Sequence, residues 1–152
     1  MKKEDLHGFV PAVVTPFNEK GEIMEDAYQH LVNWLIGQGA SAICVSGDNG
    51  ESWALSAKEK GRLTKLAVDE AAGRVPVITG CSATMLKSSV EFALAAKENG
   101  AAAVLSMPQT YVLKTTRDEL LSRFEKLNAA IDMPIVAYNS PRRAGLNLSI
   151  DD

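Results

Sequence analysis

The sequence predicts an α/β fold with a parallel β-sheet, and three observations lead to this fold class. Five short runs rich in Val, Ile and Ala mostly do not alternate with polar residues, as expected of strands buried on both faces. Four segments with the apolar spacing of an amphipathic helix lie between these runs. The runs recur roughly every 30 residues, which suits a series of strand–helix–strand units.

The expected order is strand, helix, strand, continued through five strands and four helices. The strands are expected at Phe9–Val14, Ala42–Val45, Val75–Ile78, Ala102–Leu105 and Pro134–Tyr138. The helices are expected at Asp26–Gly37, Ser56–Ala71, Met85–Asn99 and Thr116–Ala130. Ser56 with Glu59, and Thr116 with Glu119, form capping boxes in which the two residues satisfy each other's free amides. Gly100 follows the third helix, where glycine readily takes the left-handed conformation that ends a helix.

Composition narrows the class of protein. Apolar residues make up 46% of the 152 residues and charged residues 23%, which is sufficient for a folded core. The net charge of −3 argues against nucleic acid or an anionic membrane as a partner. No apolar stretch approaches the roughly 20 residues of a membrane span, and polar residues interrupt the N-terminal segment where a signal peptide needs an apolar centre. We therefore expect a cytoplasmic protein.

Cys44 and Cys81 lie inside apolar runs and do not have the spacing of metal ligands. They are expected to be reduced, buried thiols. We expect no metal site and no cofactor.

Two architectures fit the predicted elements. One is a doubly wound open sheet, and the other is part of a (β/α)₈ barrel, which takes about 250 residues when complete. Ser149 resembles the cap of a further helix. We expect residues 1–152 to be the N-terminal part of a single domain, cut before its sixth strand, or a chain that hides open sheet edges by self-association.

In either architecture, reactive groups gather at the C-terminal ends of the strands. Small, glycine-rich and hydroxyl-bearing residues occupy those positions at 15–17, 46–52, 80–82, 106–108 and 138–141. Gly47 and Gly50 allow a sharp turn whose amides suit a carboxylate or phosphate, although such a pair is also common in plain tight turns. Neither a phosphate-binding Gly-Lys-Ser/Thr loop nor a dinucleotide fingerprint is present.

Three motifs carry a more specific signal. They are Gly8–Phe17, the pattern Ser46-Gly47-x-x-Gly50-Glu51-Ser52, and Tyr138–Gly145. In this order and at these strand ends, the sequence resembles the dihydrodipicolinate synthase and N-acetylneuraminate lyase family. The resemblance implies a (β/α)₈ barrel, of which the chain supplies about the first five strands and four helices.

The resemblance also implies a function. The family acts on pyruvate or related 2-oxo acids through an imine with a lysine on strand six, and its members tend to be tetramers, so a homo-oligomer is implied. Tyr138 would be the proton shuttle, and since a phenol with a pKa of ~10 is a poor base, it needs relay partners such as Tyr111. The amides near Asn49 and Gly50 would hold the substrate carboxylate. Arg143 matches an arginine at the site entrance that binds a second, acidic substrate.

Two departures from the family pattern stand out. Asp48 occupies a position that usually holds Ser or Thr; it can accept a proton from Tyr138, but its charge would repel a substrate carboxylate unless it is offset or turned away. This suggests a substrate other than aspartate semialdehyde.

The second departure is the family's lysine, which is expected on a strand beyond residue 152. Lys114 and Lys126 fall in a helix-leading loop and a helix, so we expect this chain not to form the imine by itself. The alternative is a non-catalytic half-barrel, or a small-anion-binding module, that self-associates.

Overall fold

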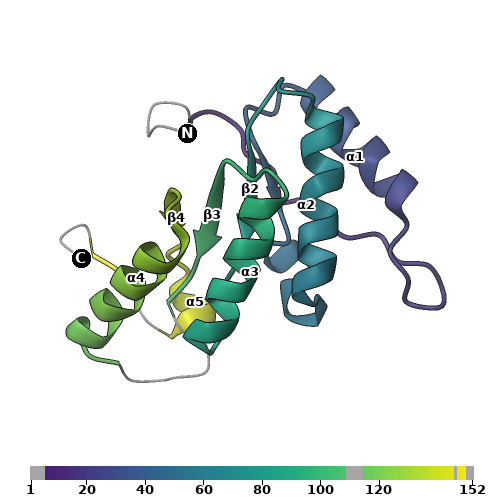
Figure 1. The fold of residues 1–152 in the computed structure, drawn as a ribbon. Coiled ribbons are helices and arrows are strands. Elements are labelled where there is room, and N and C mark those ends of the chain that lie inside the picture. The colour runs from purple at the N-terminus through teal and green to yellow at the C-terminus, as the bar shows by residue number, and fades with distance from the viewer. Residues whose placement is uncertain (1–5, 109–114, 146, 150–152) are drawn as a thin grey trace.

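The computed structural model describes residues 6–108, 115–145 and 147–149, and it contains a parallel sheet of four strands (Figure 1). The strands are β1 (Ile43–Val45), β2 (Val77–Gly80), β3 (Ala103–Ser106) and β4 (Ile135–Ala137). They pair in chain order, and all three pairings are parallel. The predicted α/β class and its parallel sheet are confirmed.

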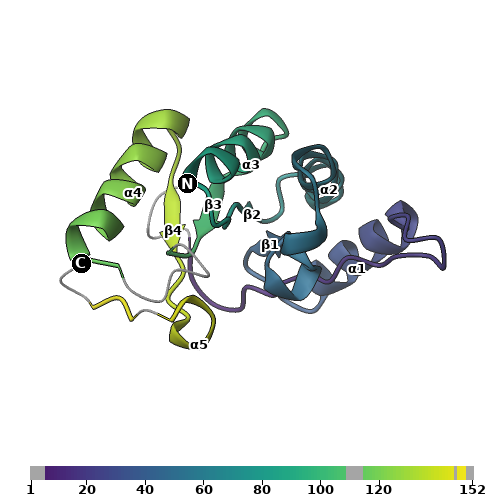
Figure 2. The same ribbon diagram turned by 90° about the horizontal axis from the view of Figure 1, so that it is seen from below.

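The helices in the described residues are α1 (Glu25–Gly37), α2 (Ala57–Ala71), α3 (Leu86–Glu98), α4 (Arg117–Ile131) and the short α5 (Pro141–Ala144). The first four cover one face of the sheet. Seen from below, α1 to α4 follow one another along the outside of a curved row of strands (Figure 2). A curved parallel sheet with helices only on its outer face is half of a (β/α)₈ barrel, so the barrel prediction is confirmed over the open sheet.

The run Phe9–Val14 was expected to form a full strand, and that prediction is only partly right. The run lies beside β1, with Val13 N donating to Cys44 O at 2.9 Å and Cys44 N donating to Pro11 O at 3.0 Å. Only an isolated bridge between Ala12 and Cys44 results. Extending the ladder toward the N-terminus would require an N–H at Pro11, which proline lacks.

The local signals predicted at the starts and ends of the helices are also confirmed. Ser56 with Glu59, and Thr116 with Glu119, form complete capping boxes at the starts of α2 and α4. Gly100 has φ of +88° directly after α3. None of the helices in the described part of the chain is long and apolar enough to span a bilayer.

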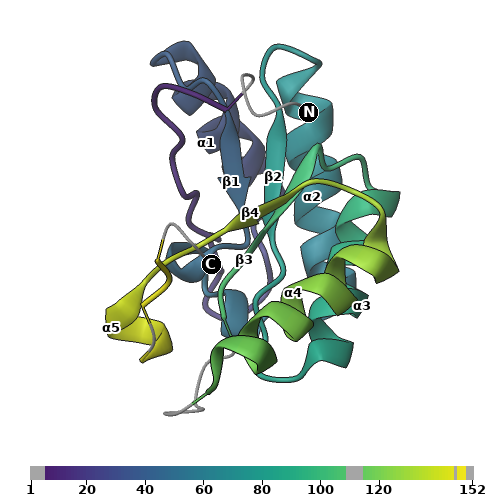
Figure 3. The ribbon, with the colours of Figure 1, turned by 90° about the vertical axis from the view of Figure 1, so that its left-hand side faces the viewer.

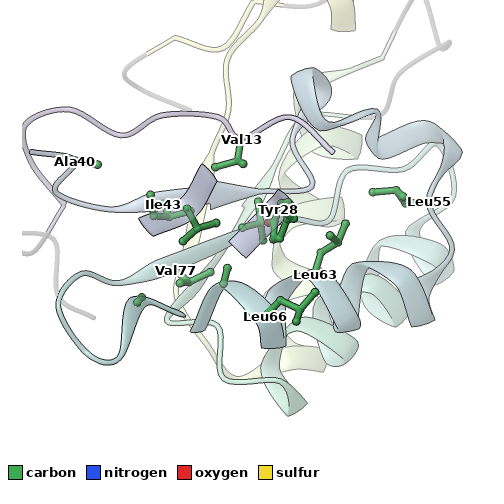
Figure 4. Packing of buried hydrophobic residues seen from close by; sticks show 12 residues of the cluster. Val13, Tyr28, Ala40, Ile43, Leu55, Leu63, Leu66 and Val77 are labelled. Carbon is green, nitrogen blue, oxygen red and sulfur yellow. The ribbon is translucent and has the colours of Figure 1, made fainter. Parts of the chain in front are cut away.

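Two apolar layers lie on opposite sides of β1 and β2. Ile43 and Val77 face the helices, where they pack with Tyr28 and Leu63 into the main core (Figure 4). On the inner face, small and branched residues form a second cluster. Its members are Ala42, Ile78, Ala103, Leu6, Val10, Leu105 and Val136. Cys44 and Cys81 are free and buried, as expected.

Figure 3 shows β4 at the exposed edge of the sheet, with α5 beyond its C-terminal end. The side chains of β4 are less buried than those of β1 and β2. The strand ends that carry the predicted site therefore open on one rim, shared by the loop after β1 and by α5.

Candidate active site

The loop at residues 46–52 follows β1 at this rim. It contains two short 3₁₀ turns, η2 (Asp48–Gly50) and η3 (Ser52–Ala54). Ser46 and Glu51 both have left-handed backbone conformations, with φ of 50° and 56°. Residues with a Cβ rarely adopt this conformation, which stores strain that the surroundings must offset.

Contacts with the N-terminal segment hold the loop in place. Thr15 Oγ1 donates a hydrogen bond of 2.8 Å to Gly50 O. A Cβ at Gly50 would stand 2.7 Å from Val13 O, so only glycine allows this close approach. The Gly50 amide donates to Gly47 O at 3.0 Å and is therefore engaged inside the turn.

Asp48 and Arg143 form an ion pair across the rim. Arg143 Nη1 lies 2.9 Å from Asp48 Oδ2, and the Asp48 side chain is only 18% exposed. The same oxygen accepts no hydrogen bond of regular geometry from the described residues, so the contact is an attraction of charges rather than an aligned bond. Arg143 reaches Asp48 from α5, a short helix that the sequence patterns did not predict. The carboxylate that would repel an anionic substrate is offset by a cation.

An inner cavity of about 330 Å³ opens where the strands end. Tyr138, Asp48 and Asn49 supply its chief polar groups. Its apolar wall belongs largely to the inner face of the sheet and includes Leu6, Val10, Ile78, Leu105 and Val136. The backbone N–H of Tyr138 donates to Ser106 O at 2.8 Å, which fixes the tyrosine at the end of β4.

An outer cavity of about 570 Å³ adjoins the inner one, since Asp48 lines both. Arg143 lines this outer cavity and is not among the residues that line the inner one. Ser52 and Phe92 form part of its wall, together with the segment that follows β2. Arg123 of α4 supports that segment by donating to Thr84 O at 3.1 Å and to the carbonyl of Ala83.

Lys60 is a feature that the sequence patterns did not single out. It lies on α2 and its side chain is fully buried. Its Nζ donates a hydrogen bond of 2.6 Å to Ser52 Oγ and lies 4.8 Å from the centroid of the Phe92 ring. Burial lowers the pKa of Lys60 to about 8, against the opposing influence of Cys81 and Asp48. Its position in the second expected helix gave no sign that this lysine faces inward.

The predicted site residues are thus brought together to different extents. Asp48, Asn49 and Tyr138 share the inner cavity, and Arg143 meets Asp48 in the outer one. Tyr111 and Lys114 lie outside the described residues, and Lys126 is exposed on α4. Within the described ranges, no three His, Cys, Asp or Glu side chains are placed to hold a metal ion.

The model of the Dihydrodipicolinate synthetase family matches residues 5–152. The chain belongs to this family. Among curated relatives, it is 37% identical over 149 residues to the 4-hydroxy-tetrahydrodipicolinate synthase of Bradyrhizobium diazoefficiens, covering 98% of this chain and 50% of that one. It is 39% identical over 142 residues to the same enzyme of Maridesulfovibrio salexigens, covering 93% and 48%.

Solved structures of the family agree with the fold. Dihydrodipicolinate synthase from Aquifex aeolicus matches with a TM-score of 0.89 and 34% identity, over 96% of this chain and 49% of that one. The chloride-inhibited dihydrodipicolinate synthase from Acinetobacter baumannii, solved with pyruvate, matches with a TM-score of 0.88 and 33% identity, over 95% and 49%. The chain spans about half the length of these members of the dihydrodipicolinate synthetase family.

Proposed function

We propose that this chain carries the first half of the active site of a Schiff-base lyase, aldolase or dehydratase that acts on pyruvate or a related 2-oxo acid. The observation that carries the proposal is the meeting of Tyr138, Asp48 and Asn49 on one cavity at the strand ends. Pyruvate is the compound bound in the Acinetobacter baumannii relative. The lysine that forms the imine is expected from a segment outside these residues, because none of the described lysines lines the inner cavity.

In this proposal Tyr138 transfers protons to and from the substrate. A phenol is a weak base near neutral pH, so a second group must take up the proton. Asp48 and Tyr111 are the proposed relay partners of Tyr138. Amides in the turn at Asn49 and Gly50 bind the substrate carboxylate, and since the Gly50 N–H is engaged with Gly47 O, the turn must adjust if that amide is to contribute.

Arg143 is proposed to bind the distal part of a substrate at the outer cavity. Its ion pair with Asp48 reduces the charge it can offer to a second carboxylate. This supports a substrate other than aspartate semialdehyde.

Trapping the imine tests the proposal. A longer protein that contains this chain and the remainder of the barrel is mixed with pyruvate and borohydride, and its mass is measured. We expect one irreversible adduct on a lysine outside residues 1–152, and none on the 152-residue chain alone. Absence of an adduct with pyruvate and with other 2-oxo acids would contradict the proposed chemistry.

The second candidate is a non-catalytic half-barrel that self-associates, with or without binding a small anion. It is favoured by the exposed edge at β4, beside which Leu120, Phe124 and Leu148 line an apolar cavity of about 420 Å³. Open edges of this kind promote pairing with another chain. Light scattering over a range of concentrations separates the candidates, since a stable monomer excludes the second one.

The remaining proposals concern the setting of the protein. We propose that residues 1–152 belong to a single barrel domain. We also propose that the protein acts in the cytoplasm as a homodimer or homotetramer.

A further inference from the structure

Lys60 is a buried ionisable group that the proposed chemistry does not use. A fully buried lysine is rare, because removing an ammonium group from water costs free energy that its new partners must offset. Among the described residues, a hydroxyl and an aromatic face meet this ammonium directly, at Ser52 Oγ and the Phe92 ring. A hydrocarbon side chain would fill the same space without that cost. The retained charge therefore needs an explanation beyond packing.

The position of Lys60 relative to the outer cavity supplies an explanation for its charge. Ser52 and Phe92, which contact its ammonium, are also wall residues of the outer cavity. Asp48 lines the same cavity and attracts Lys60 electrostatically. Two cations therefore accompany this carboxylate at the outer cavity: Arg143, which pairs with it, and Lys60, whose partners Ser52 and Phe92 line the wall. With all three groups ionised, the cluster has one net positive charge.

Lys60 also supports the backbone of the loop. Ser52 N donates to Gly47 O at 3.3 Å, so the residue that accepts the Lys60 bond is itself tied to the start of the strained turn. Lys60 lies one helical turn after the capping residue Ser56, whose carbonyl accepts the Lys60 N–H at 3.0 Å. The start of α2 therefore fixes the backbone from which the Lys60 side chain reaches Ser52.

We propose that Lys60 is a positioning residue for the candidate site: its buried ammonium holds Ser52 and offsets the charge of Asp48, so that the cavity attracts a carboxylate substrate. The attraction of a carboxylate substrate rests on the proposed function, whereas the roles of Lys60 in holding Ser52 and in offsetting the charge of Asp48 do not. Because the Lys60 charge can titrate, the groups that face it matter. They are Ser52 and Asp48 from the loop, Cys81 after β2, and Phe92 from α3.

The experiment compares Lys60→Met and Lys60→Arg with Lys58→Met, a matched control at an exposed position two residues away on α2. The first measurement is the backbone amide spectrum of the loop at residues 46–52, recorded by NMR in the 152-residue chain. We expect Lys60→Met to shift the Ser52 amide signal, because Ser52 Oγ loses its donor and Ser52 N is bonded to Gly47 O. Lys60→Arg should restore this signal, and Lys58→Met should leave it unchanged.

The reciprocal measurement leaves Lys60 in place and remains available if Lys60→Met does not fold. Asp48→Asn removes the carboxylate that attracts the ammonium, so the Lys60 pKa should fall further below about 8. A Lys60 pKa that does not move in Asp48→Asn, or a Ser52 amide signal that does not move in Lys60→Met, overturns the positioning role.

The second measurement is the affinity of the chain for pyruvate and for its uncharged methyl ester, by NMR titration. Lys60→Met should weaken pyruvate about tenfold, as expected for the loss of one nearby charge, and leave the ester unchanged. An equal loss for both compounds would overturn the electrostatic role. If the unaltered chain binds neither compound, the link to a carboxylate substrate fails, while the other two measurements still decide whether Lys60 positions the loop.

Discussion

Gly80→Ala should destabilise the fold strongly, because Gly80, at the end of β2, packs closely against the backbone of Ser46, the residue that follows β1. A Cβ at this position would lie 2.2 Å from Ser46 O and 2.9 Å from Ser46 C, whereas real Cβ atoms essentially never come within 3.0 Å of a heavy atom. The carbonyl and the new methyl group must therefore separate by about 0.8 Å or more. Both belong to buried backbone, so neither can turn aside.

Overpacking of this kind costs typically 1–3 kcal/mol, and the rigid backbone contact places Gly80→Ala at about 3 kcal/mol. That is a large share of the 5–15 kcal/mol that holds an average domain together. Urea unfolding followed by circular dichroism measures the free energy of unfolding. Gly37→Ala is the matched control: its Cβ meets open space at the end of α1, so it should stabilise by about 0.5 kcal/mol. A Gly80→Ala loss below about 1 kcal/mol would show that the strands do not approach as described.

Three further predictions concern buried polar groups. Arg123→Met should cost about 2–3 kcal/mol in urea unfolding, because it strips the donors from Thr84 O and the Ala83 carbonyl, whereas exposed Lys126→Met should change little. Burial raises the pKa of Cys44 and of Cys81 to about 11, so neither thiol should react rapidly with a disulfide reagent at pH 8 until urea is added; rapid native labelling would contradict their burial. The Lys60 pKa of about 8 lies below the ordinary lysine value of 10.5, so the unfolded chain binds more protons between these values and stability should rise from pH 8 to 9. This rise in stability should vanish in Lys60→Met. Above pH 9 the raised pKa values of the Cys44 and Cys81 thiols should lower the stability and so oppose the rise.

The features that the sequence predicted correctly depend on neighbours along the chain. A capping box needs only residues three apart, so Ser56 with Glu59 could be identified from spacing alone, and the structure has both of its bonds. Gly100 ends α3 for an equally local reason. The buried strands were evident from unbroken apolar runs, because parallel strands are covered on both faces.

The features that were missed depend on contacts between distant residues. Asp48 follows β1 and Arg143 follows β4, the first and last strands in the order of the sheet. No pattern near either residue indicates that they form an ion pair. The ammonium of Lys60 lies 4.8 Å from the ring centroid of Phe92 on α3, a contact with a distant segment that its periodic position on α2 could not show. The run at Phe9–Val14 has a strand-like composition, yet it makes a single bridge, and Pro11 has no N–H with which to extend the pairing toward the N-terminus. The amino-acid composition of a run indicates that it is buried, whereas its pairing with a neighbouring strand depends on each backbone N–H donor.

The ion pair also changes how the aspartate at position 48 is interpreted. Taken alone, a carboxylate in place of a hydroxyl disfavours an anionic substrate by charge repulsion. In the structure this carboxylate stands beside Arg143, and Lys60 lies behind the wall it shares with the outer cavity. Replacing Asp48 by threonine would therefore do more than restore a hydroxyl, since it would release the arginine and remove the carboxylate that attracts the buried ammonium. Substrate preference should therefore follow from Asp48 together with Arg143, its ion-pair partner, and Lys60, whose ammonium contacts Ser52 in the wall of the same cavity.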